Sequence, residues 1–353
     1  MKIIHTADIH LRQYGDERWE ALQKIIALGK KERVELLLIS GDLFDRAGDA
    51  EALRPHIRAL LSATGFRVCL IPGNHDKDSY AGGIYFGEDT VLLTDPHTPY
   101  EYKDVQIWGI PFEPAEREKI LYRLHTLAPR LTPDKKQIVL YHGELLDVFF
   151  SRSDFGDEGD ERYMPVKLSY FDDLRIDYVL AGHFHKRFDV RKLAQGGYFV
   201  YPGSPCSITK KEIGQRRINL FELGKPPQEL FLDTPYFAEV IVCCDPFTDK
   251  NPLEQIKERL QELPAHAQAL LTVTGFINGE ALGMTEEEFA RRAKKIAAGR
   301  CAEEEYEFRD IRQILEDDLF KDFLKKLEQA SYAAEKKQQM RETAIRGMME
   351  ARR

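Results

Sequence analysis

The chain has 353 residues, and its content of 43% hydrophobic and 31% charged residues is usual for a globular protein of about two domains. The net charge of −8 argues against a globally basic surface, and five cysteines without a C-x-x-C pair favour reduced thiols in a cytoplasmic protein. No apolar stretch reaches the ~20 residues of a membrane span, and a strand-like segment follows Met1 directly, so we expect neither a membrane anchor nor a signal peptide.

The first two-thirds of the chain alternates between strand and helix signals. Apolar runs that are typical of strands buried on both faces are found at 2–5, 34–40, 66–72, 104–111, 137–143 and 177–183. Helical periodicity lies between them, beginning after the capping residue Asp16 and again at 51–62 and 115–128. From 188 to 232 the segments are short, strand-like and rich in turns. This order predicts a layered α/β domain over residues 1–233.

The rest of the chain repeats the pattern on a smaller scale. Three strand signals and two helix signals alternate between 237 and 311, which predicts a small α/β domain over residues 234–309. From residue 310 the chain is expected to be helical, with an apolar stripe between Ile311 and Leu327 and mostly charged residues beyond it.

Five short polar motifs each follow one of the apolar runs. They are, in chain order, DIH with Asp8 and His10, GDLFD with Asp42 and Asp45, GNHD with Asn74, His75 and Asp76, YHG with His142, and GHFH with His183 and His185. In open α/β sheets, ligands bind outside the carboxyl ends of the strands, so we expect all five motifs to face one crevice. Each motif alone has an ordinary interpretation, such as a capping aspartate, a Gly-Asn turn or two strand histidines, and only the combination favours a binding site.

Such a crevice would concentrate carboxylates and imidazoles without a lysine or arginine inside the motifs. Burying unpaired carboxylates is costly, and divalent cations remove that cost. Nitrogen and oxygen donors without a thiolate suit manganese, iron, cobalt, nickel or zinc better than calcium or magnesium. Seven candidate ligands are too many for one ion and fit two ions that share a carboxylate: Asp8, His10, Asp42, Asn74, His142, His183 and His185. Two ions can clamp the attacking and leaving oxygens of a displacement at phosphorus.

The ordered set DIH, GDLFD, GNHD, HG and GHFH resembles the calcineurin-like metallophosphoesterase superfamily over about the first two-thirds of the chain. HTADIHL near the N-terminus, GDLFD, YPGSP and the small following domain are most similar to SbcD-type DNA repair exonuclease subunits. The resemblance implies a four-layer sandwich of two mixed sheets flanked by helices, then a small α+β capping domain and a helical C-terminal tail over 310–353. It also implies a dinuclear-metal-dependent nuclease, with Mn²⁺ as the expected metal, that hydrolyses phosphodiester bonds at DNA ends.

The same resemblance assigns roles to individual residues. One ion would be held by Asp8, His10, Asp42 and His185, and the other by Asp42, Asn74, His142 and His183. His75 matches the family histidine that protonates the leaving oxygen, while Asp45 and Asp76 would orient ligands or His75 through hydrogen bonds. At the position of Asp45, archaeal and eukaryotic relatives tend to carry a histidine that assists exonuclease work, so this sequence departs from their pattern.

Contacts with DNA are expected at the rim of the crevice. Ser204 in YPGSP is a candidate phosphate contact, and so are Lys186 and Arg187 after GHFH; the alternatives are an ordinary turn and a solvated charged face. Arg216 and Arg217, which follow YPGSP, are candidates for the same basic patch.

The apolar stripe of the tail can pack on its own domain or on a partner. SbcD-type proteins dock this region on the coiled-coil base of an SbcC-type ATPase in a double-strand-break repair complex, and they often dimerise through the nuclease domain. Two other functions fit the motifs. A phosphatase or phosphodiesterase acting on nucleotides or phosphoproteins would use the same metal core, although it would need neither the small domain nor the amphipathic tail. A non-catalytic scaffold is the second alternative. All seven ligand positions of this sequence carry metal-binding residues, which favours an enzyme.

Overall fold

The computed structural model describes residues 1–80, 85–114, 117–147, 164–248 and 250–351. The chain divides into two compact units, Met1–Phe237 and Ala238–Arg353, each with its own core.

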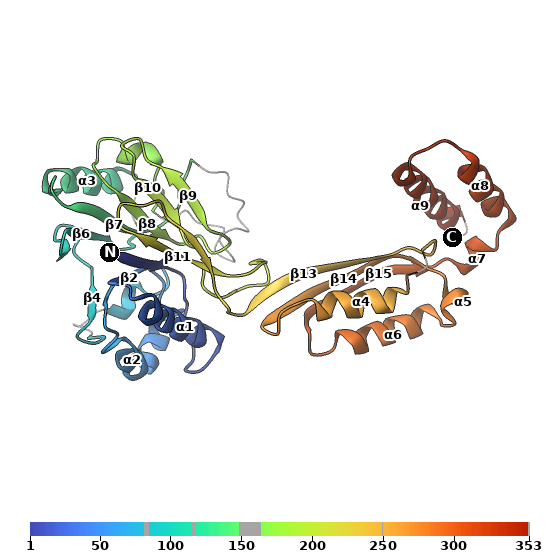
Figure 1. The fold of residues 1–353 in the computed structure, drawn as a ribbon, viewed down its shortest axis with the longest axis horizontal. Helices are drawn as coiled ribbons and strands as arrows, with labels where there is room; N and C mark the ends of the chain where they lie inside the picture. The colour runs from blue at the N-terminus through green and yellow to red at the C-terminus, as the bar shows by residue number, and fades with distance from the viewer. Residues whose placement is uncertain (81–84, 115–116, 148–163, 249, 352–353) are drawn as a thin grey trace. The chain divides into compact units, whose positions relative to one another are not determined.

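The first unit is built on two mixed six-stranded sheets (Figure 1). The first sheet has the order β12-β11-β1-β2-β3-β4, with β1 Lys2–Thr6, β2 Leu36–Ser40, β3 Arg67–Ile71, β4 Thr90–Leu92, β11 Arg217–Glu222 and β12 Glu229–Phe231. The second has the order β5-β6-β7-β8-β10-β9, with β5 Tyr100–Tyr102, β6 Val105–Ile110, β7 Lys136–His142, β8 Tyr178–Gly182, β9 Asp189–Lys192 and β10 Tyr198–Tyr201. Strands β1 to β4 pair in parallel, as do β6, β7, β8 and β10, while β5, β9, β11 and β12 are antiparallel to their neighbours.

Helices cover the outer face of each sheet, and the inner faces pack on each other. Helices α1 (Glu17–Glu32) and α2 (Ala47–Leu61) bury residues such as Leu22 and Ile57 against the first sheet. Helix α3 (Arg117–Leu127) buries Ile120 against the second sheet, and residues such as Leu38 and Leu140 fill the space between the sheets. The strands are apolar on both faces because each lies between helices and another sheet. The predicted four-layer sandwich is confirmed.

Helix α1 shows how local sequence signals position the loops of this unit. Asp16 is its N-cap and accepts a hydrogen bond from the N–H of Trp19 at 2.8 Å. The helix ends at Arg33, whose left-handed conformation turns the chain into β2. Asp16 therefore fixes the point where helix α1 begins and where the loop that carries Asp8 and His10 ends.

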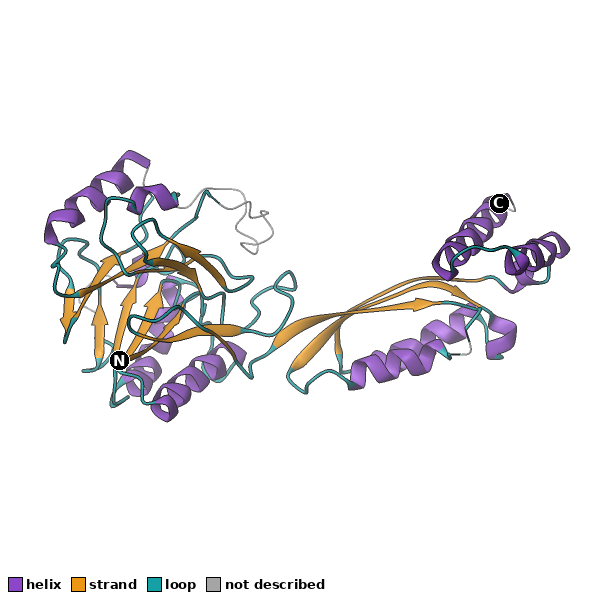
Figure 2. Cartoon of the chain, turned by 45° about the horizontal axis from the view of Figure 1, so that its top comes forward, coloured by secondary structure: helices purple, strands orange, loops and turns teal. Residues whose placement is uncertain are grey.

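The second unit is a three-stranded sheet with helices along one face (Figure 2). The sheet has the order β13-β14-β15, with β13 Tyr236–Cys244, β14 Ala267–Ile277 and β15 Cys301–Asp310. Helices α4 (Pro252–Gln261) and α6 (Glu286–Ala297) bury Ile256 and Phe289 against it, and the short α5 (Gly279–Leu282) follows β14.

The C-terminal region contains three helices where the sequence suggested continuous helix. They are α7 (Arg312–Leu315), α8 (Asp318–Gln329) and α9 (Ala334–Ala351). The break before α8 occurs at Asp317, whose side chain caps α8 by accepting from the N–H of Leu319 at 2.9 Å. Phe320 and Ile345 of these helices pack with Phe276 of β14, so part of the apolar stripe is buried within this unit.

The cysteines are free thiols, and Cys69, Cys206 and Cys244 are buried. Within the described ranges, no helix combines the length and the apolar character that crossing a membrane requires.

Candidate metal centre

The five motifs lie at or just beyond the carboxyl ends of β1, β2, β3, β7 and β8. Backbone hydrogen bonds join the loops: the N–H of Asp8 donates to Gly41 O at 3.1 Å, and the N–H of His10 donates to Asp42 O at 3.0 Å. Because these strands run parallel in their sheets, their carboxyl ends meet at one edge of the sandwich.

Four motif residues have a backbone conformation that side chains rarely adopt. Asp8, His10, Asp42 and His183 have φ angles of 55°, 51°, 51° and 94°. Such conformations cost about 1–3 kcal/mol each and typically persist at functional sites, where the surrounding structure holds them. Gly73 of GNHD is needed for close approach, because a Cβ atom there would collide with the Asp42 carboxylate. The local backbone thus directs these side chains into one cluster.

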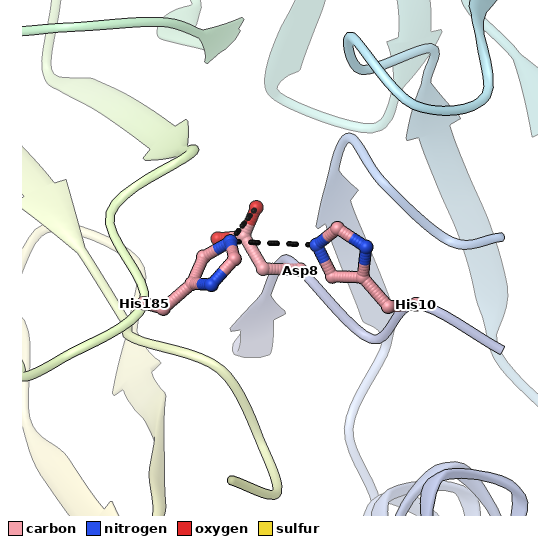
Figure 3. Close-up of side chains that lie close together, drawn as sticks. All are labelled: Asp8, His10 and His185. Atoms are coloured by element: carbon pink, nitrogen blue, oxygen red, sulfur yellow. Dashed lines mark hydrogen bonds and ion pairs between the residues drawn. The ribbon is translucent and has the colours of Figure 1, made fainter. Parts of the chain in front are cut away.

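Asp8, His10 and His185 form the first candidate metal-ligand group (Figure 3). The two imidazoles point toward each other beside the Asp8 carboxylate and come from the loops after β1 and β8. Nε2 of His10 lies 3.4 Å from Nε2 of His185, which in turn lies 3.8 Å from Asp8 Oδ1. All three side chains are buried. Two imidazole nitrogens beside a buried carboxylate are a suitable donor set for a transition-metal ion.

Asp8, Asp42 and His142 form the second group, with Asn74 beside it. Nε2 of His142 lies 3.2 Å from Asp42 Oδ2 and 2.8 Å from Asn74 Oδ1. Oδ2 of Asp42 is buried and accepts no hydrogen bond of normal geometry from the described residues. Nε2 of His10 lies 3.7 Å from the same oxygen. Asp42 therefore approaches a histidine of each group, and Asp8 belongs to both.

Three of the histidines have their second ring nitrogen against a protein acceptor. The pairs are His142 Nδ1 with Ser40 O at 2.8 Å, His185 Nδ1 with Glu212 Oε1 at 3.3 Å, and His10 Nδ1 with Asp45 Oδ1 at 3.4 Å. With a proton on Nδ1 and none on Nε2, each of these rings would direct the Nε2 lone pair into the cluster. The contacts of His142 and His185 match metal-bound histidines, whose outer nitrogen donates to a carboxylate or carbonyl, while His10 Nδ1 lies within ion-pair distance of Asp45.

The cluster carries charges that water does not reach. Burial raises the pKa of Asp8, although His185 and His142 lie near it. Burial would also raise the pKa of Asp42, but the nearby charge of His142 holds it below its ordinary value. Burial would lower the pKa of His142, and Asp42 instead raises it to about 10. The buried carboxylates thus favour a positive charge beside them, which bound divalent cations would supply in place of a proton on His142. The donor set and its unbalanced charge fit metal ions.

His183 occupies a different place from the other predicted ligands. Its backbone N–H donates to both carboxylate oxygens of Asp8, at 2.9 and 3.0 Å, and its ring centroid lies 5.4 Å from that of His142. Burial, followed by the charge of His142, lowers the pKa of His183 well below its ordinary value. It belongs to none of the candidate groups found among the described residues, so its role as a ligand stays a prediction.

His75 lies beside the cluster. Its ring centroid is 4.6 Å from that of His10, its Nδ1 is 3.1 Å from Asp45 O, and its backbone N–H donates to Asp42 Oδ1 at 3.0 Å. His10, Asp45 and His75 also form a third candidate metal-ligand group, which the motifs did not suggest.

Asp76, predicted to orient ligands or His75, is fully buried and holds the loop that carries Asn74 and His75. It accepts hydrogen bonds from the N–H groups of Gly73 at 2.7 Å and Phe44 at 3.1 Å, and from the hydroxyl of Tyr80 at 2.6 Å. Burial and the nearby Asp42 charge raise the pKa of Asp76 to about 6. Asp76 therefore acts on the backbone that carries Asn74 and His75.

The structure also identifies a functional residue that the motifs did not. Glu212 is 1% exposed, lies 3.3 Å from His185 Nδ1 and accepts from Ser204 Oγ at 2.8 Å. Ser204 was expected to contact a phosphate, but it is fully buried and has no surface to offer. Arg216 was expected on a basic patch, yet it is also fully buried and donates to the carbonyls of His185 and Ser204. The charged stretch KKEIGQRR carries no periodicity that would predict burial.

The predicted rim cations lie next to this network. Arg187 is exposed and Lys186 is half-buried. Arg217 forms an ion pair with Glu229 on the neighbouring strand β12, so part of its charge is balanced within the protein.

Comparison with known proteins identifies relatives. Residues 1–187 match the family model described as calcineurin-like phosphoesterase. The chain is 29% identical over 229 residues to a DNA double-strand break repair protein Mre11 of Sulfurisphaera tokodaii, and 26% identical over 234 residues to the protein of that name from Saccharolobus solfataricus. Each alignment covers 60% of this chain and 56% of the relative, so the chain spans little more than half the length of these relatives. A dimetal phosphatase from Danio rerio aligns in structure with 11% identity and a TM-score of 0.42, covering 65% of this chain and 98% of that one.

Proposed function

The chain belongs to the calcineurin-like phosphoesterase family, and from this premise we propose that it is a metal-dependent nuclease that hydrolyses phosphodiester bonds at DNA ends. One observation carries the proposal. Three buried imidazoles, two buried carboxylates and a half-buried amide from five segments of the chain bring their donor atoms into one cluster.

In this proposal one ion is held by Asp8, His10, Asp42 and His185, and the other by Asp42, Asn74, His142 and His183. Bound Mn²⁺ ions would supply the positive charge that stabilises the phosphate oxygens and lowers the pKa of an attacking water. The protein contributes the fixed orientation of the ligands, through Ser40, Asp45 and Glu212 behind the imidazoles.

His75 is proposed as the proton donor to the leaving oxygen. Its Nδ1 lies against the carbonyl of Asp45, and its backbone is held by Asp42, so the ring has a defined position beside the cluster. An imidazole suits this task because its ordinary pKa lies near neutral pH.

DNA as the substrate is supported by the aligned relatives, whose name describes DNA double-strand break repair. We place the chain in the cytoplasm as the exonuclease subunit of an SbcC-SbcD-like complex that dimerises through the nuclease domain. Apolar side chains on helix α8 favour the docking of a partner such as an SbcC-type coiled-coil ATPase. Leu319 is 73% exposed on this helix and Phe323 and Leu324 are only partly buried, although Phe320 and Leu327 face the core.

The substrate class is tested by offering the Mn²⁺-loaded protein end-labelled duplex DNA, single-stranded DNA, a cyclic nucleotide and a phosphopeptide in parallel. We expect the duplex to be shortened from its ends. Turnover of the cyclic nucleotide or the phosphopeptide, with both DNAs intact, would replace the nuclease with a phosphodiesterase or phosphatase. The Asp42→Ala variant should be inactive on every substrate, because Asp42 is a proposed ligand of both ions. A non-catalytic scaffold would instead keep its function in this variant.

A further inference from the structure

Asp45 connects the metal centre to the protein surface. Its Oδ1 lies 3.4 Å from His10 Nδ1 and accepts from the buried Arg18 at 3.0 Å. Its Oδ2 lies 3.0 Å from Nε of Arg12 and 3.7 Å from Nε of Arg46. One carboxylate thus faces a metal-ligand candidate with one oxygen and two surface arginines with the other.

Arg12 and Arg46 differ from Arg18 in their exposure. The side chain of Arg18 is 4% exposed, and it also donates to His10 O at 2.6 Å, so it belongs to the interior. The side chains of Arg12 and Arg46 are 53% and 79% exposed. Across the described ranges, Asp45 is the one ion-pair partner of both, so their terminal nitrogens remain available as donors.

The charges around Asp45 do not balance. One carboxylate faces three guanidinium groups, which never lose their protons in proteins, so two positive charges remain. Asp49 lies in the first turn of α2, but among the described residues no ion pair joins it to Arg46. Arg12 and Arg46 therefore present positive charge to solvent beside the site, in a chain whose overall charge is −8.

The start of helix α2 adds further donors at this place. Arg46 is its N-cap and makes no capping hydrogen bond through its side chain. The following Ala47 and Gly48 are exposed, and their N–H groups have no partner in the described part of the chain. Free N–H groups at a helix start favour anions, especially next to a cation.

The position of this pair relative to the reaction is set by Asp45 itself. The carbonyl of Asp45 contacts Nδ1 of His75, the proposed proton donor, and its carboxylate contacts His10. Asp45 is thus the residue that links Arg12 and Arg46 to His10 and His75, the groups that would face the scissile phosphate. A strand bound there would bring a neighbouring phosphate to the arginines.

We propose that Arg12 and Arg46, gathered by the Asp45 carboxylate, form a clamp for a backbone phosphate of the DNA strand next to the scissile phosphate. The clamp rests on the proposed nuclease function and names the contact that selects a polyanionic strand over a small phosphoester. Guanidinium groups suit this task because they bind phosphate oxygens with two parallel hydrogen bonds. Asp45 keeps both side chains in place without neutralising them.

The clamp is tested by the salt dependence of DNA binding. Binding of a labelled single strand and its duplex is measured by fluorescence anisotropy in the His75→Ala background, with metals bound and with the DNA checked for integrity on a gel. Each phosphate contact contributes about 0.7 to 0.9 to the slope of log affinity against log salt concentration. Adding Arg12→Ala and Arg46→Ala should lower the slope by about 0.7 to 0.9, because both arginines bind one phosphate, and weaken binding about tenfold at low salt.

Matched variants separate charge from geometry. Arg54→Ala removes the same charge from the exposed face of α2 away from Asp45 and should leave the slope unchanged. Arg12→Lys with Arg46→Lys should keep the slope, because the charges remain, but recover only part of the affinity, because lysine binds phosphate as a point charge. An Ala double variant with the parental slope overturns the clamp.

Failure of the clamp is distinguishable from failure of the proposed function. If the wild-type protein cleaves DNA and the Ala double variant binds it with the parental slope, the nuclease stands and the clamp falls. If the metal-loaded wild-type protein hydrolyses bis(p-nitrophenyl) phosphate but neither binds nor cleaves DNA, both the nuclease proposal and the clamp are wrong. Metal content and thermal unfolding of each variant show that the fold is intact.

Discussion

Replacing Glu212 by glutamine removes a buried negative charge from behind the metal centre while keeping the size of the side chain. The carboxylate is 1% exposed and accepts from Ser204 Oγ at 2.8 Å and from the N–H of Ile208 at 3.0 Å, besides its contact with His185 Nδ1. Arg216, which is also fully buried, lies 3.9 Å away. The variant therefore leaves a buried guanidinium without its counter-charge and weakens the group that orients His185.

The magnitude follows from the pKa of Glu212. Burial would raise it, but the hydrogen bond and charge of His185 and the charge of Arg216 lower it from 4.5 to about 2. This difference corresponds to about 3 kcal/mol of folding free energy. Because the folded-state pKa is the lower one, this stabilisation is present above pH 4.5 and is lost as the pH falls from 4.5 towards 2. Glutamine does not titrate and never makes this contribution.

Two measurements test this reasoning. Urea unfolding of the metal-free protein should show Glu212→Gln less stable by about 3 kcal/mol at pH 7, with the difference shrinking below pH 4.5. Titration with Mn²⁺ should show affinity about 10- to 100-fold weaker, as for other changes behind metal-bound histidines. The control is Glu88→Gln, an exposed glutamate in the same unit, which should change neither quantity. A stability difference that is independent of pH, or unchanged Mn²⁺ affinity, would refute the assigned role of Glu212.

Three further changes have defined outcomes. Gly73→Ala should lower the metal content, measured by elemental analysis, because its Cβ would displace the Asp42 carboxylate; two bound ions in this variant would contradict the close approach. Asp42→Asn should retain less metal still, because Asp42 approaches a histidine of each group; ion content equal to wild type would remove Asp42 from the ligand set. Removing metal with a chelator should lower the unfolding temperature, and Mn²⁺ at about 100 times its dissociation constant should restore about 2.7 kcal/mol; an unchanged melting curve would argue against bound ions.

Parts of the fold were predictable because the signal is local. The run 34–40 is apolar throughout since β2 is buried on both faces, and Asp16 caps α1 through a contact three residues away. Strands β4 and β5 have three residues each, too few to show a period, and the sequence did not predict them. The break at Asp317 was missed because the apolar spacing on its two sides continues the same stripe.

The candidate site divides in the same way. Asp8 and Asp42 follow apolar strands directly, so their convergence could be inferred from the rule for strand ends. Glu212 and Arg216 act through contacts with His185, 27 and 31 positions earlier in the chain, and nothing near them in sequence signals burial. Arg12 and Arg46 could not be predicted to act together, because only their shared ion-pair partner Asp45 brings them side by side.

The most direct test of the account compares turnover and metal content in one variant. His75→Ala should keep both Mn²⁺ ions, because the proposed ligands are untouched, and should cleave end-labelled duplex DNA about 10²- to 10⁴-fold more slowly than wild type, since the proton donor is lost. Cleavage at the wild-type rate with both ions bound would contradict the role of His75, and loss of an ion would make His75 a ligand of the group it forms with His10 and Asp45.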